Sequence, residues 1–505
     1  MRLSAGVARL VFRYCRIARL GSATLLTLAA SVACSGARRA GASDAIVPAR
    51  LTRADSAFAD TLQQRTFMYF WDTANRRNGL VPDRWPTPSF SSVAAVGFAL
   101  TTYPIAVEHG WVTREQAQAR VLTTLRFFWN APQGPQRSGV TGYHGFFYHF
   151  LDMQRGERFE QVELSTIDTA LLLAGALFCR QYFSGANASD STIRALADSL
   201  YYRADWSWAR DGDSTLSMGW RPDPAMYQND RGFITTHWRG YDEGMLVYVL
   251  AMGSPTHPIS ASAWDGWTAT YRWADFEGEG FLQFPPLFGH QYSHVWIDFR
   301  GIADAYMRER GSDYFQNSRK AVLSQWRYAI ANPSAWRGYD ASTWGLSASD
   351  GPLDSTFMVG GRSRTFHTYW ARGASATEVR DDGTIAPTAI GGSIAFAPEL
   401  TIRSLRAMRT QYGDSLFSRY GFVDAFNPTL DFDVTPLHHG YVVPGLAWFD
   451  HDYLGIDQGS IVSMIENERT ALVWRMMRDN PYVVRGLCRA GFRGGWLQQR
   501  CGGLE

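Results

Sequence analysis

Along most of the chain after residue 50, apolar residues recur at helical spacing, and the alternation typical of half-exposed strands is rare. Some boundaries carry cap signals: Thr113-Arg114-Glu115-Gln116 fits a capping box at a helix start, and Gly110 suits the end of the preceding helix. The pattern predicts about a dozen helices. Their expected bounds are 54–74, 91–109, 114–130, 164–183, 191–204, 243–252, 263–273, 292–310, 314–331, 398–412, 440–450 and 459–479.

Successive helices with so little strand signal predict an all-α fold, and their number suggests an (α/α)6 toroid, a barrel of helical hairpins with long loops. In this arrangement inner helices are apolar on nearly all sides, whereas outer helices are amphipathic. We expect 164–183 and 459–477 to be inner and 191–204 to be outer. One short strand pair is expected near either 281–288 or 384–396.

The predicted loops are long and rich in Trp, Tyr, Asp and Arg, and long ordered loops at one end of a helical scaffold are where sites are usually built. These loops are 75–90, 131–160, 205–242, 274–291 and 332–397.

The N-terminal residues have the pattern of an export signal, because 1–19 contain five arginines and no acid, and 20–33 are apolar but short. Ser31-Val32-Ala33-Cys34 resembles a bacterial lipoprotein cleavage site. We therefore expect an exported protein, either anchored to the outer membrane by a lipid on Cys34 or secreted into the periplasm. A linker at 35–50 would join the signal to a folded domain at 51–505.

The other cysteines are consistent with export. Cys15 would leave with the signal, and Cys488 and Cys501 could form a disulfide in an oxidising compartment. Cys179 lies within an apolar helix and reads as a small buried hydrophobe.

The charge balance argues against a nucleic-acid partner, because the chain has 49 basic and 47 acidic residues and no clustered basic stripe. Lys320 is the only lysine, which disfavours Schiff-base and P-loop chemistry, and no serine elbow or dinucleotide fingerprint occurs.

Aromatic residues reach 14% of the chain. Most of them are expected in the core, but the excess suits a groove on which sugar rings stack.

Two carboxylates, Glu163 and Asp168, stand at the entrance of the strongly apolar run 163–175, which contains no basic residue. A carboxylate beside so much apolar surface loses hydration unless a partner or substrate replaces the water, so such acids are good site candidates. Glu243 repeats this pattern at the start of another apolar segment. Two such acids facing one cleft are what cleavage of a glycosidic bond requires.

Glu243 is the first choice for general acid, because apolar surroundings raise the pKa of a carboxyl group and keep its proton near neutrality. The alternative is a helix N-terminal acid that faces the macrodipole. Glu163 and Asp168 compete for the role of base or nucleophile, and both reach one cleft if Glu163 precedes the helix. The alternative for this segment is that Glu163 or Thr166 caps the helix.

Five segments carry long motifs: 79–84 (GLVPDR), 142–153 (GYHGFFYHFLDM), 163–175 (ELSTIDTALLLAG), 288–301 (FGHQYSHVWIDFRG) and 382–387 (DGTIAP). Together they closely resemble the bacterial glycoamylase-like family, which includes endo-β-1,2-glucanases and the transglycosylating domain of cyclic β-1,2-glucan synthases. The resemblance covers about residues 55–493. It implies an (α/α)6 barrel, an extracytoplasmic location and action on β-glucan, with 51–505 as the catalytic domain.

These segments and the loop that contains Trp344 and Asp350 supply candidate substrate-binding residues, whose side chains would hydrogen-bond or stack on the sugar or hold the loops that do. The candidates are Asp83, Arg84, Tyr143, His144, His290, Gln291, Tyr292, His294, Asp298, Trp344, Asp350 and Asp382. Five tryptophans are either stacking platforms or core residues: Trp85, Trp238, Trp296, Trp344 and Trp370.

Several of these residues have a second interpretation. His290 and His294 have i, i+4 spacing, but a zinc site needs a third ligand that the sequence does not identify, so no metal or cofactor is expected. Asp298 either serves the substrate or pairs with Arg300 within the structure. Glu466 reads as a buried hydrogen-bond partner.

The sequence therefore predicts a glycoside hydrolase that cleaves β-linked glucan, with β-1,2-glucan the leading substrate. Three alternatives remain: a transglycosylase of the same fold, a polysaccharide lyase on a similar toroid, and a non-catalytic glycan-binding lipoprotein.

Overall fold

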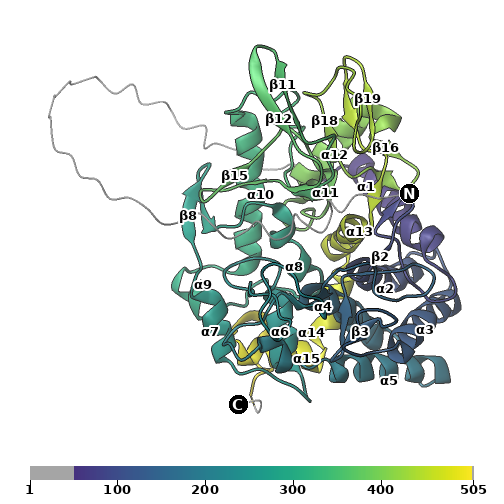
Figure 1. Cartoon of the computed structure of the whole chain (residues 1–505). Coiled ribbons are helices and arrows are strands. Elements are labelled where there is room, and N and C mark those ends of the chain that lie inside the picture. The colour runs from purple at the N-terminus through teal and green to yellow at the C-terminus, as the bar shows by residue number, and fades with distance from the viewer. Residues whose placement is uncertain (1–50, 503–505) are drawn as a thin grey trace, which may run out of the picture.

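The computed structural model describes residues 51–502, and these residues fold around a large helical core (Figure 1). The α-helices are α1 (Arg53–Thr73), α2 (Val93–Glu108), α3 (Arg114–Asn130), α4 (Thr166–Tyr182), α5 (Ala188–Arg203), α6 (Met245–Gly253), α7 (Ser262–Thr268), α8 (Tyr292–Trp296), α9 (Ala305–Glu309), α10 (Tyr314–Ala331), α11 (Pro387–Gly391), α12 (Pro398–Tyr412), α13 (Gly455–Arg469), α14 (Leu472–Arg478) and α15 (Pro481–Arg489).

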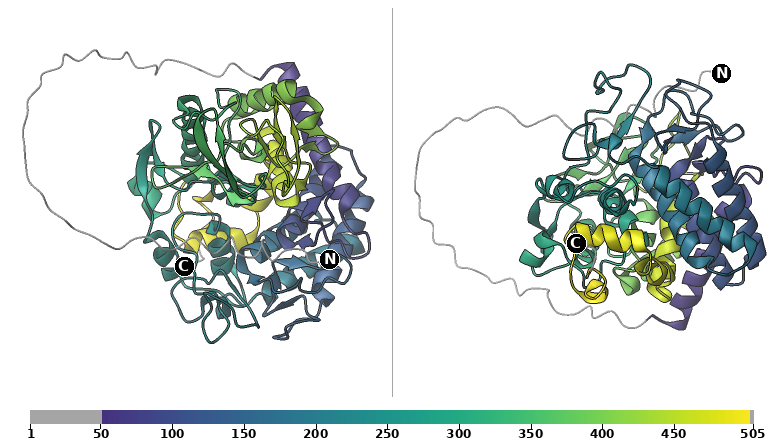
Figure 2. Two further views of the ribbon diagram at one scale, coloured as in Figure 1. Left: turned by 45° about the horizontal axis from the view of Figure 1, so that its top comes forward. Right: turned by 90° about the horizontal axis from the view of Figure 1, so that it is seen from below.

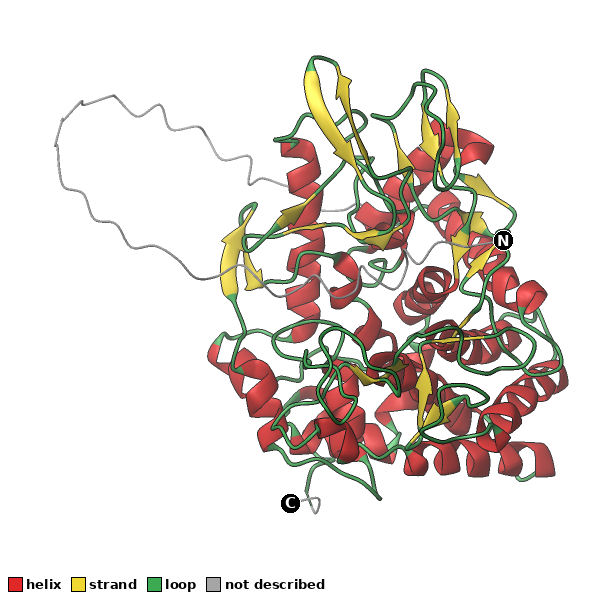
Figure 3. Cartoon of the chain, in the orientation of Figure 1, coloured by secondary structure: helices red, strands yellow, loops and turns green. Residues whose placement is uncertain are grey.

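Short strands form small antiparallel sheets in the connections, several of them gathered at the top of Figure 3. The strands are β1 (Arg84–Trp85), β2 (Ser91–Ser92), β3 (Gly142–Tyr143), β4 (Phe146–Tyr148), β5 (Phe150–Leu151), β6 (Leu164–Ser165), β7 (Gly219–Trp220), β8 (Trp273–Phe276), β9 (Glu279–Leu282), β10 (Ala348–Ser349), β11 (Ser355–Val359), β12 (Arg362–Phe366), β13 (Trp370–Ala371), β14 (Gly373–Ala374), β15 (Val379–Arg380), β16 (Phe417–Ser418), β17 (Gly421–Phe422), β18 (Phe426–Asn427), β19 (Tyr441–Val443), β20 (Ala447–Phe449) and β21 (Tyr453–Leu454). The molecule is therefore helix-rich rather than purely helical.

Buried and amphipathic helices alternate through the core. Nearly every residue of α2, α4, α6 and α13 is buried, whereas α3, α5, α10 and α12 bury one face. The buried helices pack on one another, α2 against both α4 and α13, and the amphipathic α3 and α5 cover α2 and α4. In the left view of Figure 2, the yellow C-terminal helices lie between the purple and teal parts of the chain. The burial predicted for 164–183 and the amphipathic character predicted for 191–204 are both confirmed.

Two glycines allow α2 and α4 to approach closely. A Cβ atom on Gly97 would lie 2.3 Å from the carbonyl oxygen of Leu171, and one on Gly175 would lie 2.1 Å from the carbonyl oxygen of Gly97. Because backbone atoms cannot shift as a flexible side chain can, only glycine fits at either position. This contact fixes the position of the first turn of α4, where Asp168 lies.

The strongest helical patterns give the best predictions. The expected bounds of α3, α10 and α12 agree with the structure, and Thr113 and Gln116 form the predicted capping box. A strand pair does form near the first expected place, as the β8–β9 hairpin, whereas 384–396 contains the short helix α11.

Three helix predictions are wrong. Residues 440–450 form the β19–β20 hairpin, because Val442 and Val443 favour a strand and Pro444-Gly445 favour a turn. The segment 292–310 contains two short helices separated by a loop with Gly301 at a φ of 72°. The segment 459–479 is likewise divided into α13 and α14 near Ala471, whose φ is 55°.

Cys488 and Cys501 form the expected disulfide, and Cys179 is a buried free thiol. No helix within residues 51–502 is long and apolar enough to cross a membrane. The predicted export signal, the linker and Cys34 lie outside the described residues.

Candidate active site

The first turns of several buried helices meet at one end of the core. The hydroxyl of Tyr292, the first residue of α8, lies 3.4 Å from Oδ1 of Asp457 in the first turn of α13. The hydroxyl of Thr388 in α11 donates to the carbonyl oxygen of Asp457 at 3.4 Å. Because helix N-termini carry partial positive charge, this end of the core favours carboxylates.

At the start of α4, His149 lies between the two acids that the sequence singled out. Its Nδ1 is 2.9 Å from Oε1 of Glu163, and its Nε2 is 3.6 Å from Oδ1 of Asp168. Arg221 reaches the other oxygen of Glu163 at 3.2 Å. Glu163 precedes the helix, which begins at Thr166, so both acids face the same imidazole.

The cap of α4 differs from the expectation. Ser165 is the N-cap residue and accepts a hydrogen bond from the backbone N–H of Asp168 at 3.2 Å, and its hydroxyl donates to the Asp168 carboxylate. Thr166 instead donates to the carbonyl oxygen of Ser217 at 2.9 Å. The prediction that Glu163 or Thr166 caps the helix is therefore wrong, because Ser165 already fills that position.

The protonation states of His149, Glu163 and Asp168 depend on one another. Burial lowers the pKa of His149, but the charges of Asp168 and Glu163 outweigh burial and raise it to about 9. Burial acts to raise the pKa of Glu163, but the hydrogen bond from His149 and the charges of His149 and Arg221 lower it to about 2. Burial raises the pKa of Asp168, and His149 opposes that shift. Near neutral pH, His149 is therefore a cation held between two acids.

Glu243 has the opposite electrostatic environment. It directly precedes α6, and its backbone carbonyl accepts a hydrogen bond from the Ser293 hydroxyl at 3.0 Å. Burial raises the pKa of its carboxyl group to about 7, and the charge of Asp168 contributes to the same shift. The two carboxyl groups therefore lie within electrostatic reach of each other, and Glu243 holds a proton near neutrality.

A second pair of carboxyl groups, Asp424 and Asp457, faces the same end of the core. Burial raises the pKa of Asp457 to about 7, and a hydrogen bond to Asp424 opposes that shift. Burial and the charges of both acids and of Asp83 raise the pKa of Tyr369. Asp83 also lies within the electrostatic reach of His149. A continuous group of acids thus connects the start of α4 with the start of α13.

Arg84 lines a hollow and contacts two of the acids. Arg84 contacts Asp83 through its Nε at 3.4 Å and Asp350 through its Nη1 at 2.6 Å. The hollow has a volume of about 510 Å³ and is also lined by Trp85, Met153 and Tyr420, with neighbouring residues of the 82–89 loop. The role of Asp83 and Arg84 in substrate binding stays a prediction.

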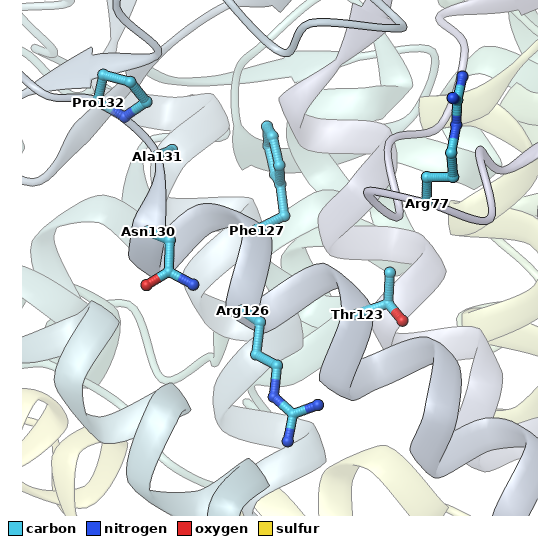
Figure 4. A pocket seen from close by; sticks show the side chains of 7 residues that line it. All are labelled: Arg77, Thr123, Arg126, Phe127, Asn130, Ala131 and Pro132. Carbon is cyan, nitrogen blue, oxygen red and sulfur yellow. The ribbon is translucent and has the colours of Figure 1, made fainter.

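A different hollow, shown in Figure 4, carries no comparable chemistry. It lies at the end of α3, has a volume of about 430 Å³, and offers no carboxylate. Its lining residues are Arg77, Thr123, Arg126, Phe127, Asn130, Ala131 and Pro132.

Tyr143 and His144 lie apart from the group of acids. The ring of His144 stacks on Trp208 with centroids 4.4 Å apart, and its Nδ1 is 3.6 Å from Oδ2 of Asp205. Tyr143 packs against Trp220 at 5.1 Å. Both side chains are partly exposed on the β3–β4 turn, so they remain candidates for contact with a long substrate.

Four other substrate-binding candidates lie in the interior. His290 and His294 are at most 1% exposed, and burial lowers their pKa values to about 4 and about 3, so both are neutral. The Gln291 amide donates to the carbonyl oxygen of Ala389, and the Trp344 indole donates to Ser404. Protein groups surround these four side chains, which fits the alternative that they hold the loops or belong to the core.

Three more candidates are enclosed in polar networks. Asp298 forms ion pairs with Arg300 and Arg478, which agrees with the structural alternative. Asp382 accepts two hydrogen bonds from Arg372, and both residues are at most 1% exposed. Asp350 is fully buried.

Two of the five tryptophans, Trp85 and Trp370, are partly exposed, and the other three are buried in the core. Glu466 bonds to His109 at 2.7 Å and Gln63 at 3.0 Å, as expected of a buried hydrogen-bond partner.

The sequence interpretation missed His149, Arg221 and Asp424. His149 stands in the 142–153 motif beside Phe150, and only the pairing of β4 with β6 brings it to Glu163. Asp424 lies in a loop with no apolar helix start to mark it, so no local signal identifies it.

Comparison with known proteins agrees with this geometry. The "Glycoamylase" family model, described as "Putative glucoamylase", matches residues 235–481. The crystal structure of a "putative glucoamylase" from Bacteroides caccae is 30% identical, with a TM-score of 0.73, and the match covers 87% of this chain and 100% of that one. The chain belongs to the glycoamylase family.

Other members of the glycoamylase family and related structures carry more specific names. An endo-β-1,2-glucanase from Chitinophaga pinensis, solved with sophorotriose and glucose, is 26% identical with a TM-score of 0.72, covering 88% of this chain and 99% of that one. An exo β-1,2-glucooligosaccharide sophorohydrolase from Parabacteroides distasonis is 28% identical over 466 residues, or 86% of this chain. The chain spans 57% of the length of that curated relative.

Proposed function

We propose that this protein is a glycoside hydrolase that cleaves β-1,2-linked glucan, with Glu243 as its general acid. The observation that carries the proposal is the raised pKa of Glu243, about 7, within reach of Asp168 at the end of the core where the helix starts meet. A glycosidic oxygen leaves poorly unless it is protonated, and a carboxyl group that keeps its proton near neutrality supplies that proton.

Asp168 is the better of the two candidates for base or nucleophile. One carboxylate oxygen of Glu163 contacts His149 and the other contacts Arg221, so Glu163 positions the imidazole rather than the substrate. Asp168 has one oxygen on the Ser165 hydroxyl and the other 3.6 Å from His149 Nε2. The cationic His149 favours the charged form of Asp168 near neutrality, and a base or nucleophile needs that form.

The names of the relatives support the β-1,2 linkage, and a site whose charged groups are mainly carboxyl groups suits a neutral sugar chain. A lyase would need an anionic substrate and a basic cleft, whereas acids dominate this site.

We further infer that the buried helices form the inner ring of an (α/α)6 toroid. Their alternation with amphipathic helices and the likeness to glucanase structures support this.

We also propose that the protein is exported, with 1–34 as the signal and Cys34 as a lipid anchor. The Cys488–Cys501 disulfide supports an oxidising compartment, because structural disulfides are rare in the reducing cytosol. Metabolic labelling with a palmitate analogue would test the anchor, since Cys34→Ser would abolish the label in a lipoprotein and leave it unchanged otherwise.

The proposal is tested by incubating the purified protein with linear β-1,2-, β-1,3- and β-1,4-glucans and measuring new reducing ends and product lengths. We expect short oligosaccharides from β-1,2-glucan alone, and a loss of at least about 10³-fold in kcat for Glu243→Gln. Glu468→Gln is the matched control, because burial also raises the pKa of Glu468 but this residue lies at the other end of α13.

Each alternative function gives a different result in this assay. A transglycosylase would give longer or cyclic products without a steady rise in reducing ends. A binding protein would retain glucan and release nothing. Release of products by Glu243→Gln at the wild-type rate would remove Glu243 from the mechanism.

A further inference from the structure

Four aspartates gather beneath the candidate site, on three segments far apart in sequence. Asp350 follows β10, Asp424 lies between β17 and β18, and Asp450 and Asp452 lie between β20 and β21. All four are at most 1% exposed. The proposed glucan chemistry assigns no step to these four side chains, although Asp424 also faces Asp457 in the candidate site.

Each aspartate uses one carboxylate oxygen to hold the surrounding chain. Oδ2 of Asp424 accepts the backbone N–H of Asp350 at 2.7 Å, and Oδ1 of Asp450 accepts the backbone N–H of Asp452 at 3.2 Å. Oδ1 of Asp452 accepts the backbone N–H of Thr87 at 2.9 Å. Oδ2 of Asp350 accepts Nη1 of Arg84 at 2.6 Å.

The other oxygen of each aspartate has no donor among the surrounding groups, except that Asp424 also faces the carboxyl group of Asp457. These oxygens are Oδ1 of Asp350 and of Asp424, and Oδ2 of Asp450 and of Asp452, each enclosed by protein. A buried carboxylate oxygen without a partner costs several kcal/mol, and buried charges are ordinarily paired or coordinate a metal. Four such oxygens in one cluster therefore need a positively charged partner.

The cations of the protein do not supply that partner. Arg84 is the guanidinium at the cluster, and its Nη1 lies 4.0 Å from Oδ2 of Asp452. His439 approaches the same oxygen with Nδ1 at 3.8 Å, but burial lowers the pKa of His439, so it is neutral near pH 7. Arg372 also lies within the electrostatic reach of Asp424, but its Nε and Nη2 bind Asp382, so the four carboxyl groups outnumber the guanidinium groups near them.

The spacing fits a divalent ion. Asp350, Asp424 and Asp450 each offer one oxygen, and these three atoms lie within 4.8 Å of one another. Oxygens on opposite sides of a calcium ion are roughly 4.6–5.2 Å apart, and those around magnesium roughly 4.0–4.2 Å. Carboxylates are hard ligands that favour these two ions over zinc or copper, and a site enclosed by protein favours calcium, because magnesium gives up its waters reluctantly.

We propose that Asp350, Asp424 and Asp450 bind a calcium ion, with Asp452 completing the site. The site shares no residue with the His290–His294 pair. The ion would fasten the 343–350, 421–427 and 447–454 segments to the β1 strand, which pairs with β21. Its role is structural and independent of the glucan chemistry proposed above.

The test measures calcium directly. The purified full-length protein is stripped with EDTA, re-equilibrated with 10–100 µM CaCl2 or MgCl2, desalted, and assayed by elemental analysis and thermal unfolding. We expect about one calcium per chain, and a rise in melting temperature of at least about 3 °C in 1 mM CaCl2 relative to EDTA. The absence of bound calcium together with an unchanged melting temperature would overturn the proposal.

Asp450→Asn tests the assignment to these side chains, because it removes the charge and retains an oxygen. We expect its calcium content to fall at least tenfold and its melting temperature to become insensitive to calcium. Asp304→Asn is the matched control, since burial also raises the pKa of Asp304 but both of its oxygens already accept hydrogen bonds, from Met307, Trp264 and Tyr314.

Protonation offers the competing account of the cluster, since burial raises the pKa of Asp424 and Asp450 well above the ordinary range. If protons alone neutralise the cluster, Asp450→Asn will be stable and calcium will bind neither protein, which contradicts the proposal. If Asp450→Asn does not fold, the calcium content and thermal shift of the wild type decide the question without it.

Discussion

Replacing His149 by glutamine is expected to destabilise the protein strongly at pH 6 and very little at pH 9.5. The imidazolium lies between Glu163 at 2.9 Å and Asp168 at 3.6 Å, and its side chain is 23% exposed. Glutamine retains a hydrogen-bonding group of similar reach but carries no charge.

The magnitude follows from the pKa of His149, which rises from 6.5 to about 9 on folding. Each pKa unit corresponds to about 1.4 kcal/mol, so the charged imidazole contributes about 3 kcal/mol of stability. Because the pKa is raised in the folded state, this contribution is complete below pH 6.5 and is lost as the pH rises through about 9. We therefore expect a loss of about 3 kcal/mol at pH 6 and less than about 0.5 kcal/mol at pH 9.5.

Urea unfolding followed by tryptophan fluorescence at the two pH values measures this difference. His144→Gln is the matched control, because burial lowers the pKa of His144, so its charge does not contribute stability that fades as the pH rises. An equal loss for His149→Gln at pH 6 and pH 9.5 would refute the electrostatic reasoning and leave only a packing role for the ring.

Three further predictions concern the site and the core. The kcat/KM for glucan should fall about tenfold per pH unit above pH 7, because Glu243 must hold a proton, and a pH–rate profile checks this. Arg372→Met should cost about 3–5 kcal/mol in a denaturation assay by leaving Asp382 buried and unpaired, and adding Asp382→Asn should restore part of the loss. Replacing Cys488 by serine should lower stability by about 3 kcal/mol, since the disulfide with Cys501 closes a short loop, while kcat of the folded enzyme stays unchanged.

The sequence predicts the helical framework well where local signals agree. α3, α10 and α12 have clear amphipathic patterns, and side-chain or proline signals mark their starts. The pattern fails at 440–450 because a run of apolar residues fits a buried strand as well as a helix, and β18, the strand that pairs with this hairpin, comes from an earlier part of the chain.

The candidate site shows the same difference between local signals and contacts made by distant parts of the chain. Glu243, Glu163 and Asp168 stand at apolar helix starts, which is a local pattern, and the structure brings them into one charge network. His149 and Asp424 enter this network only through strand pairing and loop packing, which no short stretch of sequence encodes.

The buried candidates show what a local signal leaves open. Asp382 lies in a motif segment and Trp344 lies in a long loop, but neither signal distinguishes side chains that contact substrate from those that hold the loops. Their partners, Ser404 and Arg372, lie outside the motif segments and become visible only in three dimensions.

The role of Glu243 is tested most directly by the rate of Glu243→Gln on two substrates that differ only in their leaving group. One is a β-1,2-linked glucooligosaccharide, and the other is the same oligosaccharide carrying a dinitrophenyl group, which departs without protonation. We predict a loss of at least about 10³-fold on the natural linkage and less than about tenfold for departure of dinitrophenolate. An equal loss on both substrates, or no loss on either, would contradict the assignment of Glu243 as general acid.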